Sequence, residues 1–257
     1  MPADLGLKLK NVSLSAALRH ITASVGMKFV VEPFAVVVRA NDDTRGPPPV
    51  GRELTSCEKR MEKIVFPQVQ FQNASLEEAV EFIRVSRGCL DTTNEAPLQW
   101  PVNYVIKVRE KGERPLITLD LHEISMGETL RYVAEISRTK LRFDPFAVMI
   151  TDDGDVRPRL VGNVPADKAS IILPEIQLAS VTLDEAIEFI SIKSLAHDPK
   201  KAGVRITVKA SGDPKATFDL WLKSIPVAEA LRYIAELSGH VLSFDGRQYI
   251  LIPDSGR

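Results

Sequence analysis

Ile64–Ile83 (IVFPQVQFQNASLEEAVEFI) and Ile171–Ile190 (IILPEIQLASVTLDEAIEFI) align without a gap at a spacing of 107 residues. Nine of the twenty positions are identical, and most of the others exchange one apolar residue for another. A repeat of this kind within one chain is typical of arrays built from one small supersecondary unit. We therefore expect a fold that uses the same unit more than once.

A second motif occurs three times. Leu7–Val38 matches Leu119–Ile150 at an offset of 112, and that copy matches Leu220–Leu251 at an offset of 101. Because the chain opens on this second motif, we expect that an upstream part has been cut away. The two motifs predict the following division: an orphan C-terminal half-repeat in residues 1–40, a linker in 41–61, a first full repeat in 62–152, a linker in 153–167 and a second full repeat in 168–257.

The local pattern predicts the elements of one repeat. Pro67 and Pro174 lie in β-type segments that each begin the first motif, and proline cannot donate to a ladder, so these strands are expected to lie at a sheet edge or to begin after the proline. Ser75 with Glu78, like Thr182 with Glu185, forms a capping-box pattern ahead of an amphipathic helix. Further strands, a second capped helix and a hairpin follow. The predicted class is α+β: tandem small two-layer sandwich units of order β-α-β then β-α-β-β, with mixed sheets and helices on one face.

The copies also separate residues that the fold needs from residues that it does not. Leu18, Leu130 and Leu231 occupy one equivalent helix position, so all three are expected to be buried. His20 stands where the later copies have Tyr132 and Tyr233. A ring with a polar tip therefore suits that position, and His20 is interpreted as structural.

Composition excludes several classes of function. Lys and Arg number 33 and Asp and Glu number 34, which gives a net charge near −1 and no global attraction to nucleic acid or anionic lipid. No glycine has another glycine three residues away, so the clamp of KH-type nucleic-acid modules is absent from the sequence. No apolar run approaches the roughly 20 residues that span a bilayer.

Chemical motifs are absent from the sequence as well. His20, His122, His197 and His240 lack metal-ligand spacing, and there is no GxSxG, GxxxxGK[ST] or HExxH pattern. The sequence thus predicts no catalytic residue, no metal and no cofactor. Cys57 and Cys89 are read either as two unpaired thiols or as one disulfide that ties the first linker to the first repeat.

The second motif, clearest in LDLHEISMGETLRYVAEISRTKLRFDP (119–145), resembles the short N-terminal domain shared by secretins and TonB-dependent receptors. Strand, capped helix with a Leu-Arg-Tyr core and hairpin carry the likeness, and the combined repeat is similar to secretin-type N-domains in tandem. The resemblance implies a periplasmic, non-catalytic bacterial module that contacts partner proteins or itself, as in secretion channels or receptors.

Physical reasoning gives compatible candidate surfaces. Small mixed sheets leave edge strands that accept a strand from another chain, and the Val36, Val37 and Val38 strand is the candidate edge. The half-repeat is expected to dock on the rest of the array or on another chain. The alternative is a module for cell-wall glycans or other ligands that uses Trp100 and Trp221, although both rings could equally cover neighbouring repeats. An enzyme or a nucleic-acid binder is the third reading.

Overall fold

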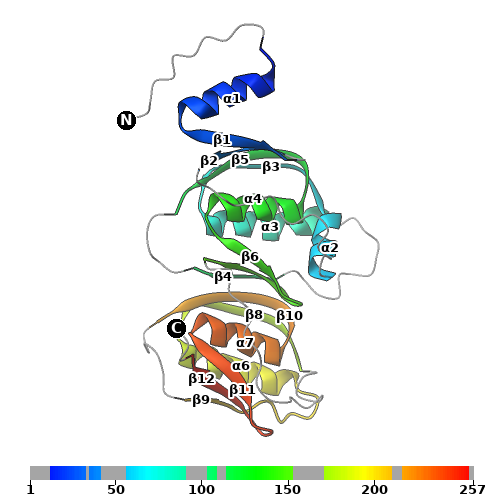
Figure 1. Cartoon of the computed structure of the whole chain (residues 1–257). Coiled ribbons are helices and arrows are strands. Elements are labelled where there is room, and N and C mark those ends of the chain that lie inside the picture. Colours follow the sequence, from blue (N-terminus) through cyan, green and yellow to red (C-terminus); the bar gives the residue numbers. More distant parts are fainter. Residues whose placement is uncertain are drawn as a thin grey trace.

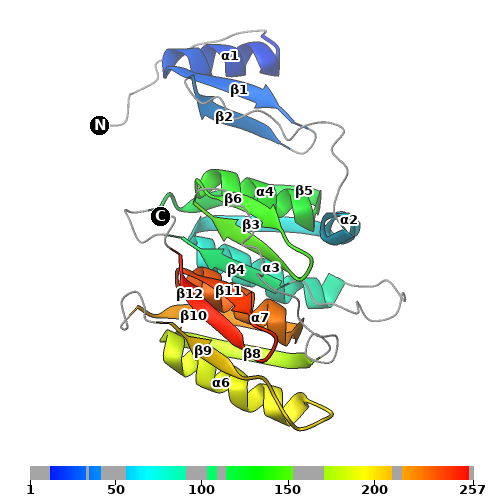
Figure 2. The ribbon, with the colours of Figure 1, turned by 60° about the horizontal axis from the view of Figure 1, so that its bottom comes forward.

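The computed structural model describes residues 12–32, 35–41, 56–90, 103–108, 114–152, 171–209 and 216–254, with the backbone alone at 56, 60 and 87–90. The fold is α+β, as predicted. Three bodies follow one another along a stack (Figure 1), and the turned view shows the same order (Figure 2). We call them the N-terminal segment (12–41), the middle unit (56–152) and the C-terminal unit (171–254).

The N-terminal segment consists of one helix and one hairpin. Helix α1 (Leu14–Ser24) begins at Ser13, whose hydroxyl accepts a hydrogen bond from the backbone N–H of Ala16. Strands β1 (Met27–Val31) and β2 (Val36–Ala40) then pair in antiparallel register. One helix packed on one hairpin gives only two layers. The apolar surface of these layers that does not face the other layer therefore needs cover from elsewhere.

The middle unit places its helices between two sheets. On one side β3 pairs with β5, and on the other β4 pairs with β7 in parallel and β7 pairs with β6. Helices α3 and α4 lie between these layers, and α2 lies at one end of them (Figure 1). The bounds are α2 (Ser56–Lys63), β3 (Val65–Ala74), α3 (Leu76–Leu90), β4 (Asn103–Lys107), β5 (Ile117–Ser125), α4 (Met126–Ile136), β6 (Lys140–Phe143) and β7 (Ala147–Thr151).

The C-terminal unit has the same order of strands and helices. Strand β8 pairs with β10, and β12 pairs with β11 and with β9, while α6 and α7 lie between the two sheets. The bounds are β8 (Ile172–Val181), α6 (Leu183–His197), β9 (Ile206–Val208), β10 (Phe218–Pro226), α7 (Val227–Leu237), β11 (His240–Phe244) and β12 (Tyr249–Pro253).

The layering differs from the expected two-layer unit with helices on one face. Within each unit the strands form two sheets and not one mixed sheet. The first strands of the two motifs pair with each other, and the remaining strands of the unit pair among themselves. Helix α7 gives the physical reason, since all of its residues from Val227 to Glu236 except Glu229 are buried. A helix that is apolar on two sides has to be covered by two layers.

Corresponding elements of the two units agree in detail. Strands β3 and β8 have the same length and the same alternation of buried and exposed residues, and α3 matches α6 in length as α4 matches α7. Asn73 and Ser180, 107 residues apart, both adopt a positive φ next to a register shift. These correspondences support the predicted tandem repeat, which remains an interpretation, as do the predicted domain limits.

Several local predictions are confirmed. Pro67 lies in the edge strand β3, between two residues that pair with β5. Glu78 accepts a hydrogen bond from the backbone N–H of Ser75, whose hydroxyl accepts one from the N–H of Glu78, and Thr182 with Glu185 repeats this box. Leu130 and Leu231 are fully buried, but Leu18 is only half-buried. The prediction for Leu18 was therefore wrong, because no second layer of described residues covers α1 as such layers cover α4 and α7.

Part of the predicted first linker is helical. Residues 56–63 form α2, which buries Cys57 and Met61 against the core of the middle unit, and Glu62 accepts a hydrogen bond from the Ser125 hydroxyl at 2.7 Å. The apolar spacing of Cys57, Met61 and Ile64 is helical, so this signal was present in the sequence.

Strand β7 belongs to two cores at once. Val148 and Ile150 pack in the core of the middle unit, whereas Ala147 and Met149 pack in the core of the C-terminal unit. All five residues of β7 are buried as a result. The sheet that closes one unit therefore also forms part of the core of the next.

Candidate functional site: joints and an uncovered face

Two joints connect the three bodies, and each brings a hairpin against a helix of the following unit. At the first joint the hairpin β1–β2 meets α4, and at the second joint the sheet β6–β7–β4 meets α7 and β10 (Figure 1). Glu135 of α4 and Glu236 of α7 are equivalent positions, 101 residues apart. Each carboxylate accepts an arginine from the preceding body.

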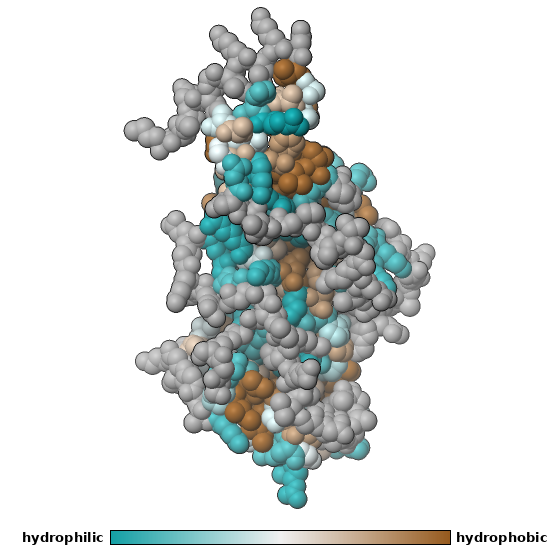
Figure 3. Space-filling model, in the orientation of Figure 1, coloured by the Kyte–Doolittle hydropathy of each residue, from teal (hydrophilic) through white to brown (hydrophobic). Residues whose placement is uncertain are grey.

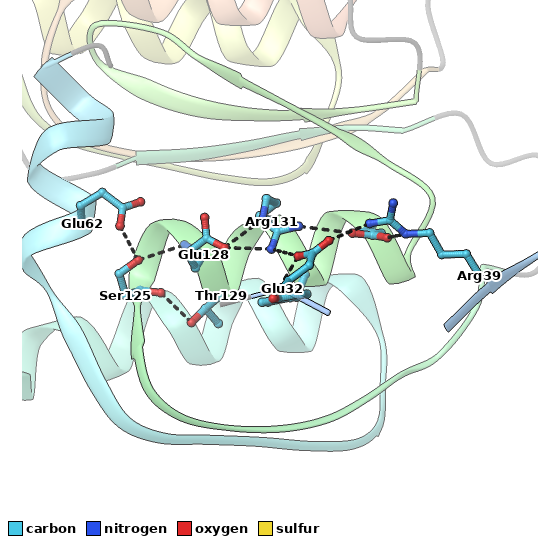
Figure 4. Close-up of polar contacts among 9 residues, drawn as sticks. Glu32, Arg39, Glu62, Ser125, Glu128, Thr129 and Arg131 are labelled. Carbon is cyan, nitrogen blue, oxygen red and sulfur yellow. Dashed lines mark hydrogen bonds and ion pairs between the residues drawn. The ribbon is translucent and has the colours of Figure 1, made fainter. Parts of the chain in front are cut away.

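The first joint is a cluster of charged side chains (Figure 4). Arg39 contacts two carboxylates, since its Nη2 donates to Glu32 Oε1 at 3.1 Å and its Nε lies 2.7 Å from Glu135 Oε1. Arg131 donates to Glu32 Oε2 and to Glu128 Oε2, and its guanidinium lies 4.2 Å from the centroid of the Tyr132 ring. Positive and negative groups alternate along the cluster, so each desolvated charge has an opposite partner.

Burial makes these contacts unlike ordinary surface ion pairs. The side chains of Glu32 and Arg39 are each only 4% exposed. Burial by itself would lower the pKa of Arg131, but hydrogen bonds and charge from Glu128 and Glu32 raise it overall. Burial also raises the pKa of Tyr132 to about 12, and its hydroxyl donates to Glu32 at 3.1 Å. At neutral pH the tyrosine is therefore a protonated donor and the arginine is a cation.

The second joint combines one ion pair with strand pairing. Arg142 of β6 binds Glu236 with two parallel hydrogen bonds of 2.9 and 2.8 Å, and Lys107 Nζ lies 3.7 Å from the same carboxylate. Hydrogen bonds to Glu236 and Asp144 raise the pKa of Arg142 against the opposing effect of burial. This bidentate geometry fixes both the distance and the orientation of the two bodies.

Asn103 extends the strand pairing across the second joint. Its side-chain oxygen accepts a hydrogen bond from the backbone N–H of Lys223 at 2.8 Å, and its amide nitrogen donates to the Lys223 carbonyl at 3.2 Å. Tyr104, the next residue, pairs with Trp221, which joins β4 to β10 in a sheet of order β6-β7-β4-β10-β8. The edge of one unit thus continues the sheet of the other.

Trp221 lies at this joint. The ring is 46% exposed, and the guanidinium of Arg84 from α3 lies 4.9 Å from its centroid. Arg84 is held by Glu81, whose pKa is lowered chiefly by the hydrogen bond from Arg84. Trp221 therefore contacts the neighbouring unit, which was one of its two predicted roles, and the glycan-binding alternative stays untested. Trp100 lies outside the described residues.

The N-terminal segment has an apolar face that no described residue covers. Leu14 is 74% exposed, whereas Met126 at the equivalent position of α4 is fully buried. Val36 and Val38 of β2 are 43% and 47% exposed, whereas their counterparts on β7 are completely buried. Apolar side chains lie at the surface of this segment (Figure 3). The exposed large apolar residues of the segment are Val12, Leu14, Ile21, Val25, Met27, Val31, Val36 and Val38.

The two faces of β2 explain where the predicted docking occurs. Val37 and Ala35 pack against the core of the middle unit, and Arg39 on the same face enters the charged cluster. The half-repeat therefore docks on the array, as expected, but through one face of β2. The expected pairing of its edge with another sheet is not seen among the described strands, where β2 pairs with β1 alone. Val36 and Val38 point away from that contact, which leaves the opposite face for another partner.

The remaining predicted site residues stay undecided. Cys57 is buried in α2, but nothing is described of the Cys89 side chain, so the disulfide remains a prediction. His20 is exposed on α1 while Tyr132 and Tyr233 are buried. Within the described ranges no group of His, Cys, Asp and Glu is arranged to hold a metal ion, and no helix is long and apolar enough to cross a membrane.

The joint residues were missed from the sequence, although a signal existed. Arg131 and Glu135 recur as Arg232 and Glu236, whereas α1 has Ala23 at the glutamate position. Helices α4 and α7, which contact a preceding hairpin or sheet, thus carry the glutamate. Helix α1, for which no preceding body is described, does not. No protein-family profile, curated protein or solved structure matches this chain.

Proposed function

We propose that this chain is a non-catalytic protein–protein interaction or assembly module. The uncovered apolar face of α1 and β2 carries the proposal, because contiguous exposed apolar surface in a soluble protein typically marks an interaction site. The resemblance to secretin and TonB-receptor N-domains supports the same class and suggests the periplasm as its compartment. A catalytic role has no support from the titratable groups described above.

The middle unit suggests what kind of partner fits this face. Leu130, Val148 and Ile150 are the counterparts of Leu18, Val36 and Val38, and they are covered by residues of β3, α3 and β4. Strand β7 is the counterpart of β2, and β4 pairs with β7 in parallel. The proposed occupant is therefore a strand–helix–strand segment of a partner protein, whose helix packs on α1 and whose second strand runs parallel to β2.

The helix of such a partner needs a defined apolar stripe. In α3 that stripe is formed by Leu76, Ala79, Val80 and Ile83, all buried. A partner helix with large apolar residues at the same spacing would bury Leu14 and Leu18 as α3 buries their counterparts. A burial of this kind stabilises by about 25 cal/mol for each Å² of apolar surface removed from water.

A fusion protein tests the proposal. A second copy of residues 62–113, linked ahead of Met1, would present a strand–helix–strand segment at high effective concentration. We expect the amides of α1 and β2 to exchange with solvent much more slowly in the fusion than in the parent chain. The matched control carries Ile83→Asp in the added copy only, which breaks the helix stripe.

Two results would overturn this partner assignment. One is equal exchange of α1 and β2 in the fusion, the control and the parent. The other is a parent chain that already dimerises in sedimentation velocity and becomes monomeric on Leu14→Glu, because the occupant would then be a second copy of the chain. A parent chain that stays monomeric is the expected result.

A further inference from the structure

A cavity of about 150 Å³ lies in the C-terminal unit, where the segment before β9 meets the turn between β11 and β12. Val204, Phe244 and Tyr249 supply apolar and aromatic walls, and Arg205 and Arg247 supply charge. A cavity of this size accommodates a ligand about as large as benzene. It belongs neither to the two joints nor to the uncovered face of α1.

Comparison with the middle unit shows that the fold does not require the polar lining. Tyr249 pairs with Ile206 as Val148 pairs with Tyr104, so Tyr249 corresponds to Val148 and Arg205 to Asn103. At the offset of 101, Arg247 corresponds in sequence to Phe146. All three polar residues of the cavity therefore replace a different kind of residue in the sister unit, although both units build the same layers.

The Tyr249 hydroxyl has no hydrogen-bond partner in the described part of the chain. Tyr249 is 1% exposed, and its Oη is buried without a hydrogen-bond partner among the described residues. An unsatisfied buried hydroxyl is unfavourable, and the sister unit avoids it by having valine at this position. Burial raises the pKa of Tyr249 to about 12, so the group is a proton donor at neutral pH.

The two guanidinium groups are available as well. Arg205 and Arg247 are exposed, and within the described part of the chain neither side chain forms a hydrogen bond or an ion pair. The nearby carboxylate of Asp245 accepts the backbone N–H groups of Arg247 and Gln248, both at 2.9 Å, and these bonds lower its pKa, with a smaller contribution from the positive charge of Arg247. The Asp245 carboxylate thus stabilises the turn between β11 and β12.

From this arrangement we propose that the cavity binds a small oxyanion, a carboxylate or a phosphate. Arginine forks match the planar geometry of a carboxylate and the oxygens of a phosphate, and such charge-assisted bonds are the strong ones. The ligand also supplies the acceptor for the hydroxyl of Tyr249, a lining residue of the same cavity. Phe244 and Val204 contact the apolar body of a carboxylate such as benzoate.

Binding of benzoate and of inorganic phosphate to the full chain tests the site. Calorimetry and thermal unfolding, with sodium chloride at matched ionic strength as the blank, should show saturable binding of at least one anion and a higher unfolding temperature. Arg205→Ala and Arg247→Ala should each weaken binding about tenfold or more. Lys209→Ala, which removes the same charge beyond the other end of β9, should leave binding unchanged. Benzoate binding without phosphate binding would identify a carboxylate site, and the reverse a phosphate site.

Tyr249→Phe provides a second, independent readout. The variant removes only the hydroxyl, so the ligand-free protein should be as stable as the parent or more stable, while anion binding weakens. The inference is overturned if neither anion binds, or if all three cavity variants bind the anion as tightly as the parent chain does. It is also overturned if Tyr249→Phe loses stability but keeps full anion affinity, because the hydroxyl would then serve the fold. None of these outcomes bears on the fusion experiment at α1.

Discussion

The two joints place a carboxylate at the same helix position but bring the arginine from different strands. Glu135 receives Arg39 from the end of β2, whereas Glu236 receives Arg142 from β6. The first joint adds further charged groups and only half-buried apolar contacts, while the second adds Met149 to the next core and a strand pair. The position of the accepting glutamate is thus the same in both helices. The donating arginine lies on a different strand of the preceding body at each joint.

The largest effect is expected from the second carboxylate. The Glu236 side chain is 1% exposed and contacts both Arg142 and Lys107, so Glu236→Gln removes a fully buried charge and leaves Arg142 with Asp144 alone. We expect a loss of roughly 3 kcal/mol in the free energy of unfolding. Glu135→Gln is the matched change, and about 1 kcal/mol is expected because the Glu135 side chain is 16% exposed and Arg39 keeps Glu32. Urea unfolding measures both, and equal losses would contradict the difference between the joints.

Apolar substitutions sharpen the same comparison. Met149→Ala empties a fully buried site in the core of the C-terminal unit and should cost about 2–5 kcal/mol. Val37→Ala at the first joint removes half-buried methyl groups and should cost about 1 kcal/mol. Chemical denaturation measures the loss in the free energy of unfolding for each variant. A Val37→Ala loss as large as that of Met149→Ala would show that the first joint also depends on apolar packing.

A smaller effect is expected where Arg84 covers Trp221. Arg84→Ala removes the cation from the ring and should cost about 0.5–1 kcal/mol. In a Trp100→Phe background the remaining tryptophan emission should move to longer wavelength, because the ring gains contact with water. Ser191→Ala, at the equivalent position of α6, should leave the emission in place. An unchanged spectrum in Arg84→Ala would rule out the stacking contact in solution.

The smallest effect concerns alkaline pH at the first joint. The pKa of Tyr132 is raised from 10 to about 12 in the folded chain, chiefly by burial, so its contribution to stability is complete below pH 10 and is lost as the pH rises through 12. Unfolding free energies of the parent and of Tyr132→Phe should therefore converge between pH 10 and pH 12. Both are measured in a Tyr249→Phe background, since Tyr249 titrates in the same window. A constant difference between the two proteins would contradict the shifted pKa.

Local features were predictable because their causes lie within a few residues. The capping boxes at Ser75 and Thr182 and the edge position of Pro67 follow from hydrogen bonds that neighbouring groups make or lack. The charged cluster was not predictable in this way. Glu32 follows β1 and Arg39 lies in β2, whereas Arg131 lies in α4, 99 residues after Glu32. An arginine near a carboxylate in sequence says nothing about which body it will meet.

The sequence by itself determined the α+β class, the order of the helices and strands other than α2, and the burial of Leu130 and Leu231, since apolar periodicity and the internal copies specify these directly. Only the tertiary structure decided that the helices lie between two sheets, that β7 serves two cores, and that α1 keeps an uncovered face. The physical reason is that periodicity shows which residues avoid water but not which surface covers them. That choice depends on packing between bodies that are distant in the chain.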